Sequence, residues 1–233
     1  MRHAVGNPWY FNLGRTEESV AAYRRSIVLA EELLAADLKN ALARGDVAGA
    51  HWAFGLTLRG NDPASAAKLL RRSLDESAAV MNGSPHTFAF IHNAANSHIA
   101  LAGALGQLGD RTAALAYFRK GLELQRRIAK ARAAQPGLRH NMIATLTQLG
   151  LAMLAAGVRS GAREHLDEAL RIAESVPRDN AILSKLPDIA ACHAGQGRLS
   201  ASAGNRRSRS CRRWRRARMN TARNCNHSPS SSR

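Results

Sequence analysis

The chain has 233 residues, enough to bury a sizeable core, and it carries a formal net charge of +17. It contains no run of 18 apolar residues, and the N-terminal segment over positions 1–12 lacks the apolar stretch of a signal peptide, so we expect a cytoplasmic protein without a membrane span. The cysteines, Cys192, Cys211 and Cys225, form no CxxC pair and indicate neither a zinc knuckle nor a disulfide framework.

The positive charge is concentrated at one end of the chain. Eleven Arg and no Asp, Glu or Lys lie between Arg198 and Arg233, so 17 − 11 leaves +6 for positions 1–197. The body of the chain is therefore only mildly basic, and its net charge does not by itself indicate a nucleic-acid-binding domain.

Apolar residues at helical spacing, separated by Gly and Pro turns, predict a series of helices after an extended lead-in over residues 1–12. Asn40 is expected to cap the second helix, and Pro63 to open the third. Pro187 would kink the last helix or shift its start. The expected helices span residues 14–37, 40–58, 63–81, 86–107, 111–134, 138–156, 159–175 and 180–195.

Related five-residue segments recur in register, beginning at Tyr23, Leu70, Phe118 and Leu166, so that successive starts differ in sequence number by 47, 48 and 48. A fixed period in this range is typical of a helical repeat array, and two helices of about 20 residues with their turns fill one period. We predict an all-α, right-handed α-solenoid with three complete helix pairs, a leading half unit and a trailing half unit.

Each unit repeats a pattern of small and large residues. It runs through Leu149, Gly150, Met153, Gly157, Ala162, Leu166 and Ala169 in one unit, and through Leu101, Ala102, Leu105, Gly109, Ala114, Phe118 and Gly121 in the unit before. In the second unit we match Ala53, Leu56, Gly60, Ala66, Leu70 and Ser73, with a one-residue shift in the turn. These units resemble tetratricopeptide repeats over residues 13–197, which implies that the small residues lie where helices cross.

A narrower resemblance concerns the N-terminal part. Val5-Gly6-Asn7-Pro8, Asn12-Leu13-Gly14 and the segment from Tyr23 to Asp37 look like the long-period repeats that follow bacterial serine/threonine protein kinase domains. No strand–Lys, His-Arg-Asp or Asp-Phe-Gly element of a kinase is present, so we assign no phosphoryl transfer to this chain. The resemblance implies a detached or truncated regulatory array.

Paired basic residues recur on the helices that come second in each unit, and we call this set the basic ladder. It could form a track for an acidic partner, but we favour a solvated face on which these cations pair with Glu31, Asp75, Glu76 and Glu123. The ladder ends at Asp167-Glu168. Its members are Arg24, Arg25, Arg71, Arg72, Arg119 and Lys120.

Polar residues recur on the helices that come first in each unit, which line the inner groove in tetratricopeptide folds. We call them the candidate groove residues: His92, Asn93, Asn96, His140, Asn141, Thr147 and Gln148. They could bind main-chain groups of an extended peptide, although we favour a structural role in which Asn93 and Asn141 cap or tie helices. The Lys and Asn pattern of the carboxylate-clamp subfamily is missing, which argues against recognition of a chaperone's acidic tail.

No catalytic constellation, cofactor motif or metal-ligand spacing emerges from the sequence. The nine His residues lack metal spacing, and Cys192 is most simply a small buried residue. We therefore expect a non-enzymatic interaction scaffold without cofactor or metal, which binds a peptide or a partner domain.

Residues 198–233 form an Arg/Ser-rich tail. One interpretation is an altered reading frame that replaces a repeat, because positions that should be apolar are Arg or Ser. The others are a disordered basic tail that binds nucleic acid, with Trp214 stacking on a base, and a degenerate folded repeat.

Overall fold

The computed structural model describes residues 16–83, 87–131, 136–175 and 186–202, and all of these form helices or short turns between them. The helices are α1 (Thr16–Ala36), α2 (Ala41–Leu58), α3 (Pro63–Gly83), α4 (Phe88–Gln107), α5 (Arg111–Ala131), α6 (Pro136–Ala155), α7 (Arg159–Ser175) and α9 (Leu186–Ser202).

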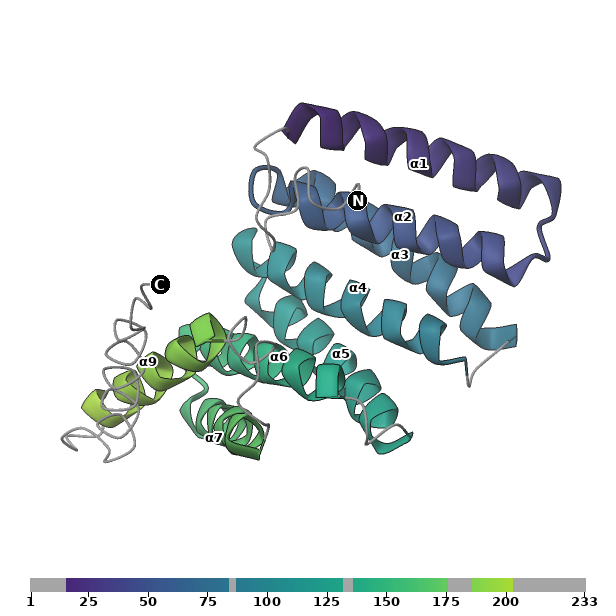
Figure 1. Ribbon diagram of the computed structural model, residues 1–233. Helices are drawn as coiled ribbons and strands as arrows, with labels where there is room; N and C mark the ends of the chain where they lie inside the picture. The colour runs from purple at the N-terminus through teal and green to yellow at the C-terminus, as the bar shows by residue number, and fades with distance from the viewer. Residues whose placement is uncertain (1–15, 84–86, 132–135, 176–185, 203–233) are drawn as a thin grey trace, which may run out of the picture.

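The described part of the chain is an all-α helical solenoid of stacked helix pairs, as predicted. The first helices of successive pairs begin at Ala41, Phe88 and Pro136, and the second helices at Pro63, Arg111 and Arg159. Equivalent helix starts therefore differ by 47 or 48 in sequence number, which confirms the period. In Figure 1, α2, α4 and α6 lie in front, with α3 and α5 behind them.

The predicted turn chemistry is present at the helix starts. The Asn40 side chain accepts hydrogen bonds from the backbone N–H groups of Leu42 and Ala43, both at 3.0 Å, and so caps α2. Asp110 does the same for Ala113 at the start of α5. Gly109 and Gly157 have φ values of 86° and 81°, a left-handed conformation that favours Gly after a helix end.

Small residues allow close approach at the helix crossings, as the resemblance implied. A Cβ added to Gly150 would lie 2.7 Å from Cγ of Leu166, and one added to Gly121 would lie 3.1 Å from the carbonyl oxygen of Ala95. Leu166 is fully buried in the core cluster that joins α6, α7 and α9. Any side chain at these Gly positions would push the paired helices apart.

The register predicted for the second unit was wrong. Gly55, not Ala53, lies at the crossing of α2 and α3, where an added Cβ would be 2.8 Å from Cγ of Leu70 and 3.2 Å from the carbonyl oxygen of Ala66. These contacts correspond to those of Gly150 with Leu166 and Ala162. The step from Gly55 to Ala66 is one position shorter than the step from Gly150 to Ala162, so the second unit has one residue fewer between these equivalent positions, not one more.

The last described helix begins and ends later than predicted. We expected residues 180–195, whereas α9 begins at Leu186 and continues to Ser202. Pro187 stands in its first turn, where no backbone N–H is needed, so it shifts the start and does not kink the helix. The lead-in and residues 203–233 of the tail lie outside the described residues.

Candidate functional site

Three polar side chains occupy equivalent positions on the front helices. Asp46 on α2, Asn93 on α4 and Asn141 on α6 differ in sequence number by 47 and 48, as the starts of these helices do. Asp46 is exposed and both Asn are half-buried, and none of the three side chains hydrogen-bonds to another described residue. The equivalence shows that this polar position is a recurrent feature of the first helices.

Two further amides extend this row. Asn96 follows Asn93 by three residues, and Gln148 follows Asn141 by seven, so each lies within about 60° of its predecessor on the same helix face. Both are half-buried and without a side-chain hydrogen bond to the described residues. We call Asp46, Asn93, Asn96, Asn141 and Gln148 the polar row.

The Asn residues of the row do not cap or tie helices through their side chains. The N-cap of α4 is Thr87, and α6 begins five residues before Asn141. Only their backbone carbonyls are engaged: Ser97 donates to that of Asn93, and Thr145 to that of Asn141, each at 3.0 Å. The two side-chain amides are therefore left without a hydrogen-bond partner among the described residues.

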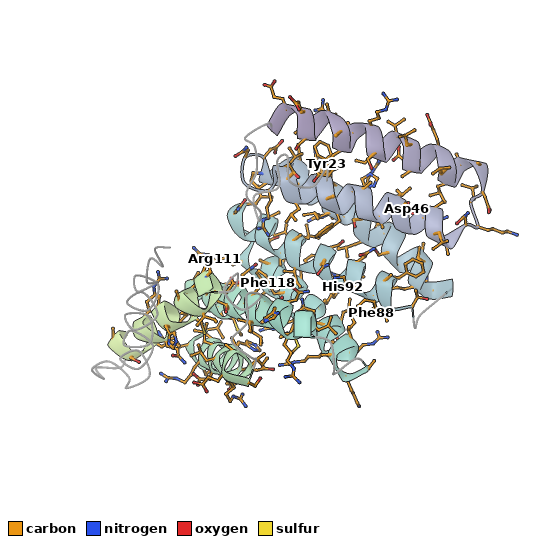
Figure 2. All side chains as sticks on the ribbon, viewed as in Figure 1. Tyr23, Asp46, Phe88, His92, Arg111 and Phe118 are labelled. Carbon is orange, nitrogen blue, oxygen red and sulfur yellow. The ribbon has the colours of Figure 1, made fainter. Side chains whose placement is uncertain are left out.

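The structure places the other candidate groove residues differently. Thr147 is 1% exposed, and its hydroxyl donates to the Ile143 carbonyl at 2.8 Å. His140 is 5% exposed. Figure 2 shows His92 beside Phe88, and their rings stack at 5.6 Å; burial lowers the pKa of this imidazole. These three residues pack against protein, and the structure does not bring them into the polar row.

Asp46 was missed by sequence reasoning. It is a carboxylate whereas Asn93 and Asn141 are amides, so it is not part of the recurring His-Asn pairs at 92–93 and 140–141. The signal was present, because Asp46 precedes Asn93 by one full repeat period. Figure 2 shows it on α2, in the same front layer as His92 on α4.

All members of the basic ladder are exposed, on α1, α3 and α5. We expected Glu31 to form an ion pair with a cation on its own helix. Instead, its carboxylate on α1 lies 3.8 Å from the guanidinium of Arg72 on α3. Lys120 lies 5.7 Å from the ring centroid of Tyr117. The ladder therefore belongs to the second helices and is separate from the polar row.

A basic cleft opens between α5 and α7, with a volume of about 460 Å³. Arg126 forms a two-pronged contact with Glu168 across it, at 2.6 and 2.9 Å. Glu168 is one of the acidic residues at which the ladder ends, and it neutralises part of this charge. The lining residues are Arg119, Leu122, Glu123, Arg126, Arg127, Lys130 and His165.

Burial shifts the pKa values of two side chains, His98 and Cys192. Burial, followed by the charge of Lys120, lowers the pKa of His98 to about 4. Burial raises the pKa of the Cys192 thiol to about 12, and this thiol donates to the Leu166 carbonyl at 3.0 Å. Cys192 is thus a packing residue held as a neutral thiol, as expected from sequence. Within the described ranges, no cluster of three His, Cys, Asp or Glu could hold a metal ion.

Two segments match models of the tetratricopeptide repeat family, residues 95–128 and 142–176. No curated protein matches the chain in sequence. In structure the chain is similar to BtubC (BKLC) from P. vanneervenii, with 15% identity, a TM-score of 0.52, and coverage of 94% of this chain and 95% of that one. This likeness supports the solenoid fold alone. Among the helices described, none is long and apolar enough to cross a membrane.

The matched segments divide the α4–α5 and α6–α7 pairs into a repeat core and an extension. The first match begins seven residues into α4, and the second begins six residues into α6. Ile91 and Leu138 of the extensions are buried in a small core together with Ile128, the last residue of the first match. Asn93 and Asn141 lie in these extensions, whereas Asn96 and Gln148 lie in the repeat cores.

Proposed function

We propose that this chain, two segments of which match tetratricopeptide repeats, is an interaction scaffold that binds an extended segment of a partner protein across α2, α4 and α6. Tetratricopeptide repeats are protein-interaction modules in general. The observation that supports this particular site is the polar row, in which Asp46, Asn93 and Asn141 recur in register and no side chain has a hydrogen-bond partner among the described residues.

The chemistry of the row suits a peptide main chain. Each side-chain amide offers a donor and an acceptor, the same pair of groups that each peptide unit presents. A hydrogen bond of this kind contributes about 0.5–1.5 kcal/mol net. Since Asp46 replaces an amide with a carboxylate, the partner segment is expected to carry a basic or neutral residue where it crosses α2.

A selection of displayed random peptides on the full chain tests this proposal. We expect enriched peptides whose affinity falls about tenfold in the Asn93→Ala, Asn141→Ala double variant, because two hydrogen bonds are lost. Asn82→Ala, at an exposed position near the end of α3, is the matched control and should leave affinity unchanged. Equal binding by all three proteins would refute the site.

The same selection separates the basic ladder from the polar row. If the partner is acidic and uses the ladder, the Arg119→Ala, Lys120→Ala double variant should weaken binding more than the Asn variant does. Both residues are exposed on α5 and do not line the front helices. If only the ladder variant loses affinity for the selected peptides, the binding surface lies on the second helices.

A second proposal is that the array regulates a bacterial serine/threonine protein kinase in the cytoplasm. It is motivated by the sequence resemblance of the N-terminal segment and by the long period, since one unit from Phe88 to Pro136 extends beyond both ends of the repeat match at 95–128. A kinase reading frame directly upstream in the genomic DNA would support this origin. An unrelated upstream frame would count against it.

A third proposal concerns nucleic-acid binding through the tail. Because α9 continues to Ser202, the informative truncation removes residues 203–233 and leaves the helix intact. The full chain is expected to bind single-stranded DNA more tightly than the truncated chain, with an affinity that falls as salt rises. Equal weak binding by both would remove the tail from consideration.

A further inference from the structure

The outer face of α1 carries exposed apolar side chains beside Arg25 and Glu32, and it has no neighbour among the described helices. Val28, Leu29 and Leu33 are 51%, 50% and 61% exposed. Figure 1 shows α1 at the edge of the array, with α2 next to it on one side only. Three large apolar side chains exposed on one helix favour a site of association.

The opposite face of α1 is already occupied. Ala30 and Leu34 are buried against Ala43 and Val47 of α2, and the ring of Tyr23 stacks on Phe54 at 6.2 Å. Figure 2 shows Tyr23 between α1 and α2. The outer face is thus a second contact surface of the same helix and not the one that holds α1 on the array.

The outer face is partly self-complementary. Exposed residues at equal distances from a point between Val28 and Leu29 form matching pairs, either like with like or a cation with an anion. Arg24 with Leu33 and Ser26 with Glu31 do not match. The matching pairs are Ala21 with Ala36, Ala22 with Ala35, Arg25 with Glu32, and Val28 with Leu29.

We propose that two copies of the chain associate through this face, with their α1 helices antiparallel and a two-fold axis between Val28 and Leu29. Such a contact is isologous, so each surface is its own complement. Arg25 and Glu32 lie nearest the line between the two helices, so the helices pack at about 10 Å, the upper end of the usual range. Val28 and Leu29 flank this line on either side of the axis, and the four Ala leave room beside it.

The charges select the antiparallel arrangement. In it, Arg25 faces Glu32 of the partner subunit, and the same pair forms again across the axis. A parallel arrangement would place Arg25 against Arg25 and Glu32 against Glu32, which is repulsive. Both side chains are exposed, and neither has a partner among the described residues, so both are available for this contact.

Sedimentation equilibrium of the full chain and its variants tests the proposal. We expect a monomer–dimer equilibrium that Leu29→Lys abolishes, because a charge would be buried at the axis. Arg25→Glu and Glu32→Arg should each weaken the dimer at least tenfold, and the double variant should restore the dissociation constant to within about threefold. Leu108→Lys, at a position 48% exposed after α4, is the matched control and should not change it.

Three results would overturn the proposal. The first is a monomer at all concentrations up to about 100 µM. The second is a dimer that Leu29→Lys leaves intact. The third is a dimer that the double variant Arg25→Glu, Glu32→Arg forms no more tightly than either single variant does. Circular dichroism of each variant establishes that helix content is unchanged, so that loss of the dimer is not loss of the fold.

Discussion

Gly121→Ala is expected to destabilise the array, although Ala is the better helix former. Gly121 lies within α5, and an added Cβ would be 2.6 Å from Cγ1 of Ile99 and 3.1 Å from the carbonyl oxygen of Ala95. The first distance is shorter than real Cβ contacts, and the second involves backbone of α4 that cannot rotate away. The two helices must therefore separate or shift.

The net effect follows from two opposing contributions. Replacing Gly by Ala inside a helix stabilises it by about 1 kcal/mol. Overpacking a close contact costs about 1–3 kcal/mol, and contact with backbone favours the upper part of this range. We therefore expect Gly121→Ala to lower the free energy of unfolding by about 1–2 kcal/mol.

Urea denaturation followed by circular dichroism measures this difference, with Gly49→Ala as the matched control. Gly49 also lies inside a helix, but nothing is within 4 Å of an added Cβ, so only the helix propensity changes. The control should gain about 0.5–1 kcal/mol. If Gly121→Ala unfolds at the same urea concentration as the parent or at a higher one, α4 and α5 accommodate the added methyl group without loss of stability.

Three further predictions concern a cap, a buried imidazole and a buried thiol. Asn40→Ala should lower the free energy of unfolding by about 1 kcal/mol in the same urea assay, because the N–H groups of Leu42 and Ala43 lose their acceptor; an unchanged midpoint would contradict this cap. The pKa of His98 is lowered to about 4, so the unfolded chain binds the imidazole proton more tightly than the native chain does. The free energy of unfolding should therefore have its full value above pH 6.5 and should decrease as the pH falls toward 4. His98→Phe should reduce that decrease, and an identical pH profile would show that other groups cause it. With its pKa raised to about 12, the Cys192 thiol should resist iodoacetamide at about pH 8 until urea unfolds the chain, as mass spectrometry of its peptide would reveal; rapid labelling of the native chain would disprove its burial.

The features predicted best are those set by local chemistry. The cap at Asn40, the turns at Gly109 and Gly157 and the helix period depend on residues that are close in sequence, and the structure confirms them. The register of the second unit depends on a contact between helices. Since α2 contains Gly45, Gly49 and Gly55, the sequence offers no local reason to choose Gly55 as the one beside Leu70.

The candidate site was predictable only in part for the same reason. Spacing identified Asn93 and Asn141 as equivalent, but it did not reveal which side of α6 faces the core. Apolar residues lie on several sides of that helix, so the burial of Thr147 and the half-exposure of Gln148 follow from packing against α7 and α9. The outer face of α1 likewise became recognisable only when its other face was seen to pack on α2.

A partner segment bound along α2, α4 and α6, as we propose, would contact the polar row. Side-chain amide signals in a ¹⁵N–¹H spectrum report on it directly, because Asn93, Asn96, Asn141 and Gln148 each carry an NH₂ group that gains a hydrogen-bond partner on binding. On addition of a selected peptide, we predict that these signals shift while that of Gln125, buried on α5, stays in place. Shifts confined to α5 and α7, with the signals of the polar row unmoved, would contradict the account.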